Sequence, residues 1–229
     1  MSIQRALVIG AGSGVGHATA SALTAAGARV LAAGHERDAT DPAQVGALLA
    51  EADPDLAVVV AAGTRPRMAS REEQSWESFS APWNVDVKIA FEVGRAALAR
   101  PLRPNSTVLI VSSGAGLDGS PLSGSYAGAK RMQMFLASYL QRAADARELG
   151  IRFVALAPRQ ILVSTPIGEA AAAAYGAETG ESVEAYMKRR FPVPLDAAGV
   201  ASAILSIASD DEHRGTTALA LTASGLEVI

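Results

Sequence analysis

A glycine-rich segment near the N-terminus constrains the fold of this chain more than any other feature. The segment GAGSGVG occupies residues 10–16, with glycine at every second position, and it overlaps the end of the apolar run RALVIGA at 5–11. A helical pattern follows over 14–27 and closes on a glycine, a frequent helix terminator. Glycine permits a tight turn and a close approach of other groups to the backbone. We therefore predict a short buried strand that turns sharply into a helix.

The same alternation of apolar runs and helical patterns continues along the chain. It predicts strands at 5–11, 28–34, 55–63, 106–113, 151–158 and 216–222, helices at 14–27, 41–53, 73–99, 121–149 and 196–209, and one or two lid helices over 165–190. Strands that alternate with helices predict βαβ units and a parallel sheet. We expect an α/β fold: one doubly wound Rossmann-type domain over residues 1–229, with a parallel sheet of about seven strands, helices on both faces and a lid at about 159–191.

Composition excludes several classes of function. The formal net charge is only −3, which disfavours a nucleic-acid partner. The chain has no cysteine, and His17, His35 and His213 lack metal-ligand spacing, so we expect neither thiol chemistry nor a metal site. The start of the chain lacks the apolar region of a signal peptide, and no apolar stretch reaches the roughly 18 residues of a membrane span. We expect a cytoplasmic protein with no membrane partner.

The segment SYAGAK at 125–130 places Tyr126 and Lys130 four residues apart, and Ser113 precedes them. On a helix, residues four apart share a face, so the phenol and the ammonium can point into one site. A free tyrosine, with a pKa of about 10, is a weak acid near neutral pH, and a neighbouring cation favours the phenolate. The pair is therefore a candidate proton donor. A half-buried tyrosine and a solvated lysine on an ordinary amphipathic helix is the alternative interpretation.

The glycine segment has the strand-to-helix context of a dinucleotide site. Its glycines would let the backbone approach a pyrophosphate, and the N-terminus of the following helix would offer N–H groups and a positive dipole end. A tight turn that binds nothing is the alternative.

The second predicted strand ends in Gly34, His35, Glu36 and Arg37. An acidic residue at this end favours NAD, and basic residues suit the 2′-phosphate of NADP. Because glycine stands where we expect the acid, and His35 and Arg37 could flank a phosphate, we expect NADP(H) rather than NAD(H). Glu36 is the counter-argument, since it could reach a ribose hydroxyl, and Arg37 could also be a solvated loop charge.

Together these segments resemble the short-chain dehydrogenase/reductase family over nearly the whole chain, in an unusually short version. The glycine segment matches the family pattern GxxxGxG at Gly10, Gly14 and Gly16, and AAG at 61–63 is similar to the family's NAG. VSS at 111–113 ends on the position of the catalytic serine, Ser113, and YAGAK matches the family's Tyr-x-x-x-Lys.

This resemblance implies roles for individual residues. Ser113 would bind the substrate oxygen, Tyr126 would transfer the proton, and Lys130 would favour the phenolate and bind the nicotinamide ribose, while the cofactor carries the hydride. The implied dinucleotide site consists of Gly10, Ser13, Gly14, Val15, Gly16, Gly34, His35, Arg37, Asp38, Ala39, Ala61, Ala62, Gly63, Tyr126, Lys130, Pro158 and Ile161. Asp38 and Ala39 resemble the family's adenine-contacting pair.

The chain departs from the family pattern at four places. Only three residues separate Gly34 from Asp38, so a family helix there is expected to be absent. Asp86 stands where the family has an asparagine that holds a water of the proton relay, and we assign it to the catalytic group; Asn84 is the other possible counterpart. Arg159 replaces a glycine after Pro158, and TASG at 222–225 replaces the usual DGG.

The predicted substrate is a small or medium ketone or aldehyde, or the corresponding secondary alcohol. Its site should be walled by 114–123, by the helix that carries Asp86 and by the lid. The lid offers apolar side chains that suit an apolar substrate, lid packing or a subunit interface: Ile161, Leu162, Ile167, Tyr175, Tyr186, Met187 and Phe191.

Two other functions are compatible with this sequence. The chain could be a redox-neutral family member, such as an epimerase or dehydratase, or a catalytically silent nucleotide-binding regulator.

The family usually pairs its long helices between subunits, here 73–99 and 121–149, and the second has many apolar side chains: Met132, Met134, Phe135, Leu136 and Tyr139. We therefore expect a homodimer or homotetramer.

Overall fold

Seven strands form one sheet at the centre of the protein, with the order β2-β1-β3-β4-β5-β6-β7. The computed structural model describes residues 3–55, 57–210 and 212–229; Leu56, within the third predicted strand, lies outside them. The strands are β1 (Arg5–Ile9), β2 (Arg29–Ala33), β3 (Ala57–Val60), β4 (Thr107–Val111), β5 (Arg152–Pro158), β6 (Ala218–Thr222) and β7 (Gly225–Val228). The first six are parallel, which confirms the predicted α/β fold, and β7 pairs antiparallel with β6.

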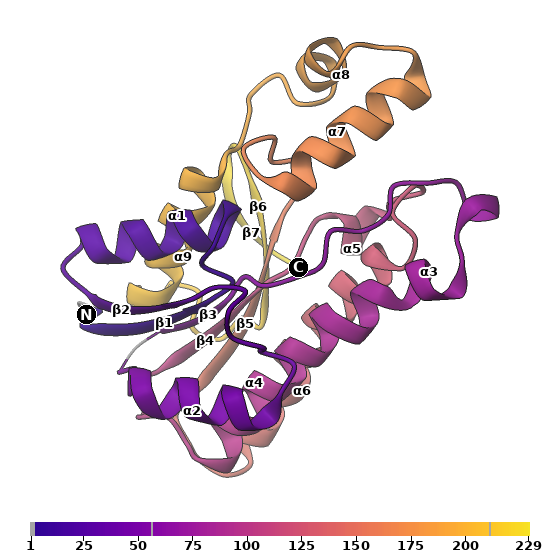
Figure 1. The fold of residues 1–229 in the computed structure, drawn as a ribbon. Coiled ribbons are helices and arrows are strands. Elements are labelled where there is room, and N and C mark those ends of the chain that lie inside the picture. The colour runs from indigo at the N-terminus through magenta and orange to yellow at the C-terminus, as the bar shows by residue number, and fades with distance from the viewer. Residues whose placement is uncertain (1–2, 56, 211) are drawn as a thin grey trace.

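The helices cover both faces of the sheet (Figure 1). They are α1 (Gly14–Ala25), α2 (Pro42–Ala52), α3 (Trp76–Pro82), α4 (Lys88–Ala99), α5 (Ala115–Asp118), α6 (Tyr126–Asp145), α7 (Pro166–Thr179), α8 (Val183–Arg190) and α9 (Ala197–Ser209), with short helical turns η1 (Arg71–Glu73) and η2 (Trp83–Val87). Figure 1 shows α1 and α9 on one face and α2, α4 and α6 on the other, while α7 and α8 stand away from the sheet.

Alternation along the strands produces two hydrophobic cores. In β1, Leu7 and Ile9 pack with the core under α2, α4 and α6, whereas Ala6 and Val8 pack with the core under α1 and α9. Successive side chains of a strand point to opposite faces, so a strand between two helical layers must be apolar throughout. This explains why the central strands read as continuous apolar runs.

Three features of the secondary structure differ from the prediction. The helix expected over 73–99 is divided into η1, α3, η2 and α4, because Pro82 has no N–H to donate and the chain adopts a π-helical turn directly after it. The helix expected from 121 begins at Tyr126, since Gly124 has a φ of +57° that ends the preceding turn. The antiparallel strand β7 was not predicted; the chain reverses between Thr222 and Gly225, whose φ is +123°.

The expected lack of a helix after Gly34 is confirmed. The chain passes from β2 directly to α2, which is capped by the Asp41 carboxylate and starts with Pro42. β2 pairs with β1 and lies at one edge of the sheet. Within the described residues, no helix is long and apolar enough to cross a membrane, and no group of His, Cys, Asp and Glu side chains is arranged to hold a metal ion.

Candidate active site

A cavity of about 1060 Å³ lies at the carboxyl ends of the parallel strands. In open α/β sheets, ligands bind at this edge. Nearly all of the predicted site residues line it: Gly10, Ser13, Gly14, Val15, Gly34, His35, Arg37, Asp38, Ala39, Ala61, Ala62, Gly63, Ser113, Tyr126, Lys130, Pro158 and Ile161. Gly16 and Asp86 are the two predicted residues that do not line it, and both are buried directly behind its wall.

The glycine segment forms one end of the cavity. A Cβ at Gly10, whose φ is +88°, would overlap the backbone of Ala62, and a Cβ at Gly16 would overlap the carbonyl of Gly10. Gly16 therefore serves the packing of helix on strand, while a Cβ at Gly12 would meet only the His35 side chain, at 4.0 Å. No side chain caps the N-terminus of α1, so its first N–H groups are free for an anion. This cradle fits the pyrophosphate of a dinucleotide.

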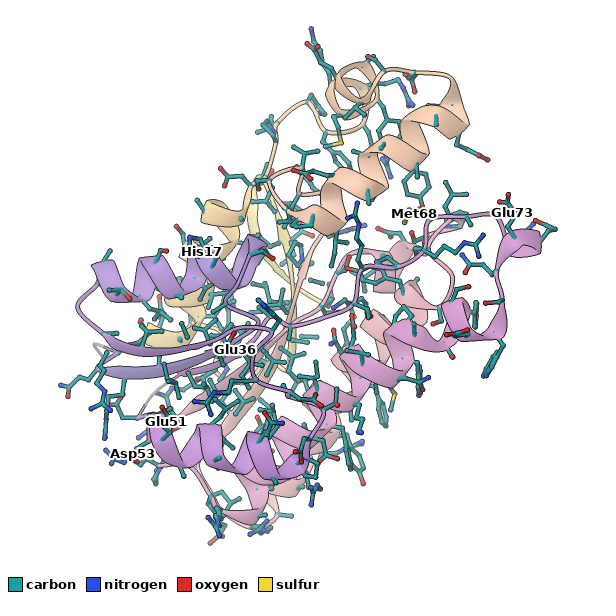
Figure 2. All side chains as sticks on the ribbon, in the orientation of Figure 1. His17, Glu36, Glu51, Asp53, Met68 and Glu73 are labelled. Carbon is teal, nitrogen blue, oxygen red and sulfur yellow. The ribbon has the colours of Figure 1, made fainter. Side chains whose placement is uncertain are left out.

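The end of β2 forms the adjoining wall. The Gly34 N–H donates to Glu36 Oε1 at 2.8 Å, and Glu36 does not line the cavity, whereas His35 and Arg37 do. Hydrogen bonds from the backbone N–H groups of Glu36 itself and of Gly34 lower the pKa of Glu36, which is therefore ionised. Figure 2 shows Glu36 beside the loop that follows β2. Arg37 lies 3.4 Å from Glu51 of α2.

Tyr126 and Lys130 lie one turn apart at the start of α6, as the spacing predicts. The Lys130 Nζ stands 5.3 Å from the centroid of the Tyr126 ring and 3.4 Å from the Val111 carbonyl at the end of β4. The Lys130 backbone carbonyl accepts a hydrogen bond from Ser112 Oγ at 2.7 Å, which joins α6 to β4. Ser113 follows directly, and its Oγ accepts only a 3.2 Å hydrogen bond from the Ala115 N–H within the described chain, so the hydroxyl can still donate.

Asp86 lies under this group, in the π-helical turn η2. Its Oδ2 meets Lys130 Nζ as an ion pair at 3.1 Å and has no well-aligned hydrogen bond within the described chain. Its Oδ1 accepts from both the N–H and the hydroxyl of Thr64, each at 2.7 Å. A Cβ at Gly63 would stand 2.7 Å from Asp86 Oδ2, so the carboxylate needs glycine there. Asn84 is exposed and donates to Ser80, which leaves position 86 as the one in contact with the lysine.

Lys130 remains protonated in this setting. Burial by itself lowers the pKa of Lys130, but the Asp86 carboxylate and Tyr126 raise it, and the net direction is upward from the ordinary value. The Asp86 side chain has no exposed surface and that of Lys130 is 5% exposed. A charge so buried requires a partner, and each residue supplies it for the other.

A family model described as "Enoyl-(Acyl carrier protein) reductase" matches residues 32–225. This chain belongs to the short-chain dehydrogenase/reductase family. No curated protein sequence matches it. Among solved structures, the sorbitol-6-phosphate 2-dehydrogenase SrlD from Erwinia amylovora has a TM-score of 0.76 at 23% identity, covering 90% of this chain and 92% of that one.

Two further solved structures share the fold of this short-chain dehydrogenase/reductase. The aldohexose dehydrogenase AldT from Thermoplasma acidophilum has a TM-score of 0.77 at 22% identity, over 96% of this chain and 92% of that one. A short chain dehydrogenase from Mycobacterium avium has a TM-score of 0.72 at 20% identity, over 99% and 84%. At these identities the likeness establishes the fold of the family member and not its substrate.

Sequence patterns did not predict several of the residues in this site. The segment after β3 contributes Arg65, Pro66 and Met68 to the cavity, and Figure 2 labels Met68 on this segment. Thr64, which binds Asp86, had no sequence signal beyond its place next to Gly63. Arg159, which follows Pro158, lines the cavity and pairs with Asp118 at 3.1 Å.

The lid side chains divide into two groups. Those that line the cavity are Ile161, Leu162, Ile167, Tyr175, Tyr186 and Phe191, and Met187 does not. The wall opposite the lid, from Ala115 to Ser123, is mostly small and polar. The substrate end of the cavity is therefore apolar on the lid side and polar on the side of α5.

Proposed function

We propose that this chain is an NADP(H)-dependent oxidoreductase that reduces a ketone or aldehyde carbonyl, or oxidises the corresponding secondary alcohol. The convergence of Ser113, Tyr126 and Lys130 on one cavity with the glycine cradle carries the proposal. The short-chain dehydrogenase/reductase family acts with NAD(P) on alcohols and carbonyls, which supports the reaction type.

Each side chain has a defined task in this reaction. When bound, the nicotinamide supplies or accepts the hydride at the substrate carbon. Ser113 donates a hydrogen bond to the substrate oxygen and fixes its position. The Tyr126 hydroxyl gives its proton to that oxygen in reduction and takes the proton back in oxidation. Lys130 stabilises the phenolate as a fixed cation and binds ribose hydroxyls, and Asp86 holds the lysine in place.

The end of β2 supports NADP(H) over NAD(H). His35 and Arg37 line the cavity there and can face a 2′-phosphate, while the Glu36 carboxylate is held by the Gly34 N–H and does not line the cavity. The pairing of Arg37 with Glu51 is long, at 3.4 Å, and both side chains are about half exposed. Such an exposed pair is weak and leaves the guanidinium free to turn to a phosphate.

The exposed faces of α4 and α6 support a homodimer or homotetramer. Phe91 on α4 and Phe135 and Tyr139 on α6 are 41%, 49% and 51% exposed, and the two rings on α6 stack at 5.8 Å. A second hollow of the surface is lined by Phe91 and Tyr139 together with Leu98 and Leu140. Grouped exposed aromatic side chains are typical of protein interfaces.

The test is the oxidation of NADPH and NADH, each measured with a panel of ketones and aldehydes and with an enoyl thioester. Turnover of a carbonyl compound with NADPH ahead of NADH is the expected result. Reduction of only the enoyl thioester would move the reaction to a carbon–carbon double bond. Cofactor binding without net oxidation, but with epimerised or dehydrated product, would favour a redox-neutral reaction, and binding with no product at all would favour a silent regulator.

A further inference from the structure

A hydrogen bond between two hydroxyl groups joins the two helices of the lid, α7 and α8 (residues 166–190), to the opposite wall of the cavity. Tyr175 Oη of α7 and Ser120 Oγ lie 2.7 Å apart, and the Leu122 N–H approaches the same phenol oxygen at 3.5 Å. We propose that Tyr175 and Ser120 are specificity-determining residues, because their bond holds the lid over the substrate end and limits the size of the carbonyl substrate that reaches Tyr126. This proposal rests on the function proposed above.

The lid is held together internally, so that it moves as one body. Tyr175 stacks on Tyr186 of α8 at 6.2 Å. Glu181, between the two helices, accepts hydrogen bonds from Arg189 at 2.6 and 2.8 Å and from Thr179 at 2.7 Å. The hydrogen bonds from Arg189 and Thr179 lower the pKa of Glu181 to about 2, which keeps this link ionised over the working range of pH.

The lid is tied to the body of the protein at its base. Gln160, before α7, donates to the Val193 carbonyl at 3.0 Å and accepts from the Leu195 N–H at 2.8 Å, so the two connecting segments are bound side by side. Ser164 Oγ accepts from the Ala197 N–H at 3.2 Å. These contacts define a hinge, and Figure 1 shows α7 and α8 projecting from it away from the sheet.

Beyond the hinge, Tyr175 provides the polar attachment. Within the described chain, it is the one side chain of residues 166–190 with a hydrogen bond or ion pair to a residue outside the lid and its hinge. Its partner is fixed from the other side. Ser123 donates to the Ser120 carbonyl at 3.2 Å, and Asp118 pairs with Arg159 at 3.1 Å. Ser120 therefore lies on a segment bound to the body of the protein, while its partner Tyr175 lies on the lid.

The Tyr175–Ser120 bond lies at the cavity, where it can limit the size of the substrate. Tyr175 and Ser120 line the same cavity as Ser113 and Tyr126, and their bond joins the lid side of that cavity to the wall formed by residues 115–123. A substrate that fits within the closed cavity leaves the bond intact, and a larger one must break it. One neutral hydrogen bond of this kind changes the ratio of open to closed lid about 3- to 10-fold. Removal of either hydroxyl should therefore favour bulky substrates.

Hydrogen exchange of the lid tests the bond without reference to turnover. Tyr175→Phe and Ser120→Ala should each raise the exchange rate of peptides over 163–193 about 3- to 10-fold, and the double variant should add nothing to either. Tyr186→Phe is the matched control, because Tyr186 stacks on Tyr175 and its own hydroxyl has no hydrogen-bond partner within the described chain. In this variant the exchange should stay at the wild-type rate. Unchanged exchange in both single variants, or effects that add in the double variant, would overturn the proposal.

The ratio of kcat/KM for 4-phenylcyclohexanone to that for cyclohexanone, measured with NADPH, tests specificity. Both single variants should raise this ratio by a similar factor. A ratio that stays at the wild-type value while lid exchange rises would overturn the role in specificity. If wild type turns over no carbonyl compound of the panel, the proposed function fails, and the exchange experiment alone decides whether the bond holds the lid.

Discussion

The Lys130 ammonium lies 3.1 Å from the Asp86 carboxylate, and neither side chain has more than 5% of its surface exposed. The carboxylate is oriented by two hydrogen bonds from Thr64, and the lysine lies beside the Tyr126 ring. In this short-chain dehydrogenase/reductase, Lys130 therefore lies between the negatively charged Asp86 and the proposed proton donor Tyr126. The charge of the lysine is balanced within the protein before any ligand binds.

Asp86→Asn should shift the pH profile of alcohol oxidation toward lower pH. The negative charge of Asp86 opposes formation of a second negative charge on Tyr126, and Lys130 is cationic with either residue near neutral pH. A shift of one pH unit corresponds to about 1.4 kcal/mol of interaction. The measurement is log kcat/KM against pH for wild type and variant with the same alcohol. Superimposable profiles would place Asp86 outside the proton transfer.

Lys130→Met should destabilise the protein more than the double variant Lys130→Met with Asp86→Asn. The single variant leaves a buried carboxylate without a counter-charge, which costs about 3–5 kcal/mol in the free energy of unfolding. The double variant removes both charges and should recover most of that loss. Urea unfolding at neutral pH measures both values. Equal destabilisation by the two variants would show that the charges are not coupled.

The same pair has a defined dependence on pH. The pKa of Lys130 is raised in the folded state, so its contribution to stability is fully present below the unfolded pKa of about 10.4 and is lost as pH rises through the folded value. The difference in unfolding free energy between wild type and the double variant should therefore stay constant from about pH 7 to pH 10 and decrease in more alkaline solution. A difference that already decreases between pH 7 and pH 9 would contradict the raised pKa.

The sequence predicted those parts of the site whose arrangement is set within a few residues of the chain. The spacing of Tyr126 and Lys130 and the glycines of the first turn specify their own arrangement, because helix periodicity and turn sterics act over a few residues. The contacts of Asp86 with Thr64 and of Tyr175 with Ser120 join positions 22 and 55 residues apart, and nothing near any of the four residues specifies its partner. The π-helical turn directly after Pro82 was also missed, because a helical sequence pattern does not distinguish a π-turn from regular α-helix.

Tyr126→Phe should abolish turnover while NADPH still binds within about two-fold of the wild-type Kd. The substitution removes only the hydroxyl, and removal of a general acid lowers rates by about 10²–10⁴-fold. Fluorescence titration with NADPH and a rate assay on the same preparation separate binding from chemistry. Rates near those of wild type would remove Tyr126 from the mechanism.

Wild type should show a higher kcat/KM with NADPH than with NADH, and Gly34→Asp should reverse or erase that preference. A carboxylate at this position can bind the ribose 2′-hydroxyl and repels a 2′-phosphate. A Cβ at Gly34 would stand 2.5 Å from Glu36 Oε2, so the flexible Glu36 side chain must turn away. Glu36→Gln is the matched control and should leave KM for NADH unchanged. A rise of that KM would instead assign the ribose contact to Glu36 and count against the NADP(H) proposal.

Replacing Phe135 and Tyr139 together by glutamate should convert the proposed dimer or tetramer to a monomer. Both side chains lie stacked on the exposed face of α6, and burial of two carboxylates at an interface carries a large desolvation penalty. Light scattering at micromolar concentration measures the mass before and after substitution. Val183→Glu on α8, at a valine that is 43% exposed, is the matched control and should leave the mass unchanged. A monomeric wild type would contradict the proposed assembly, and a double variant that keeps the wild-type mass would move the interface away from α6.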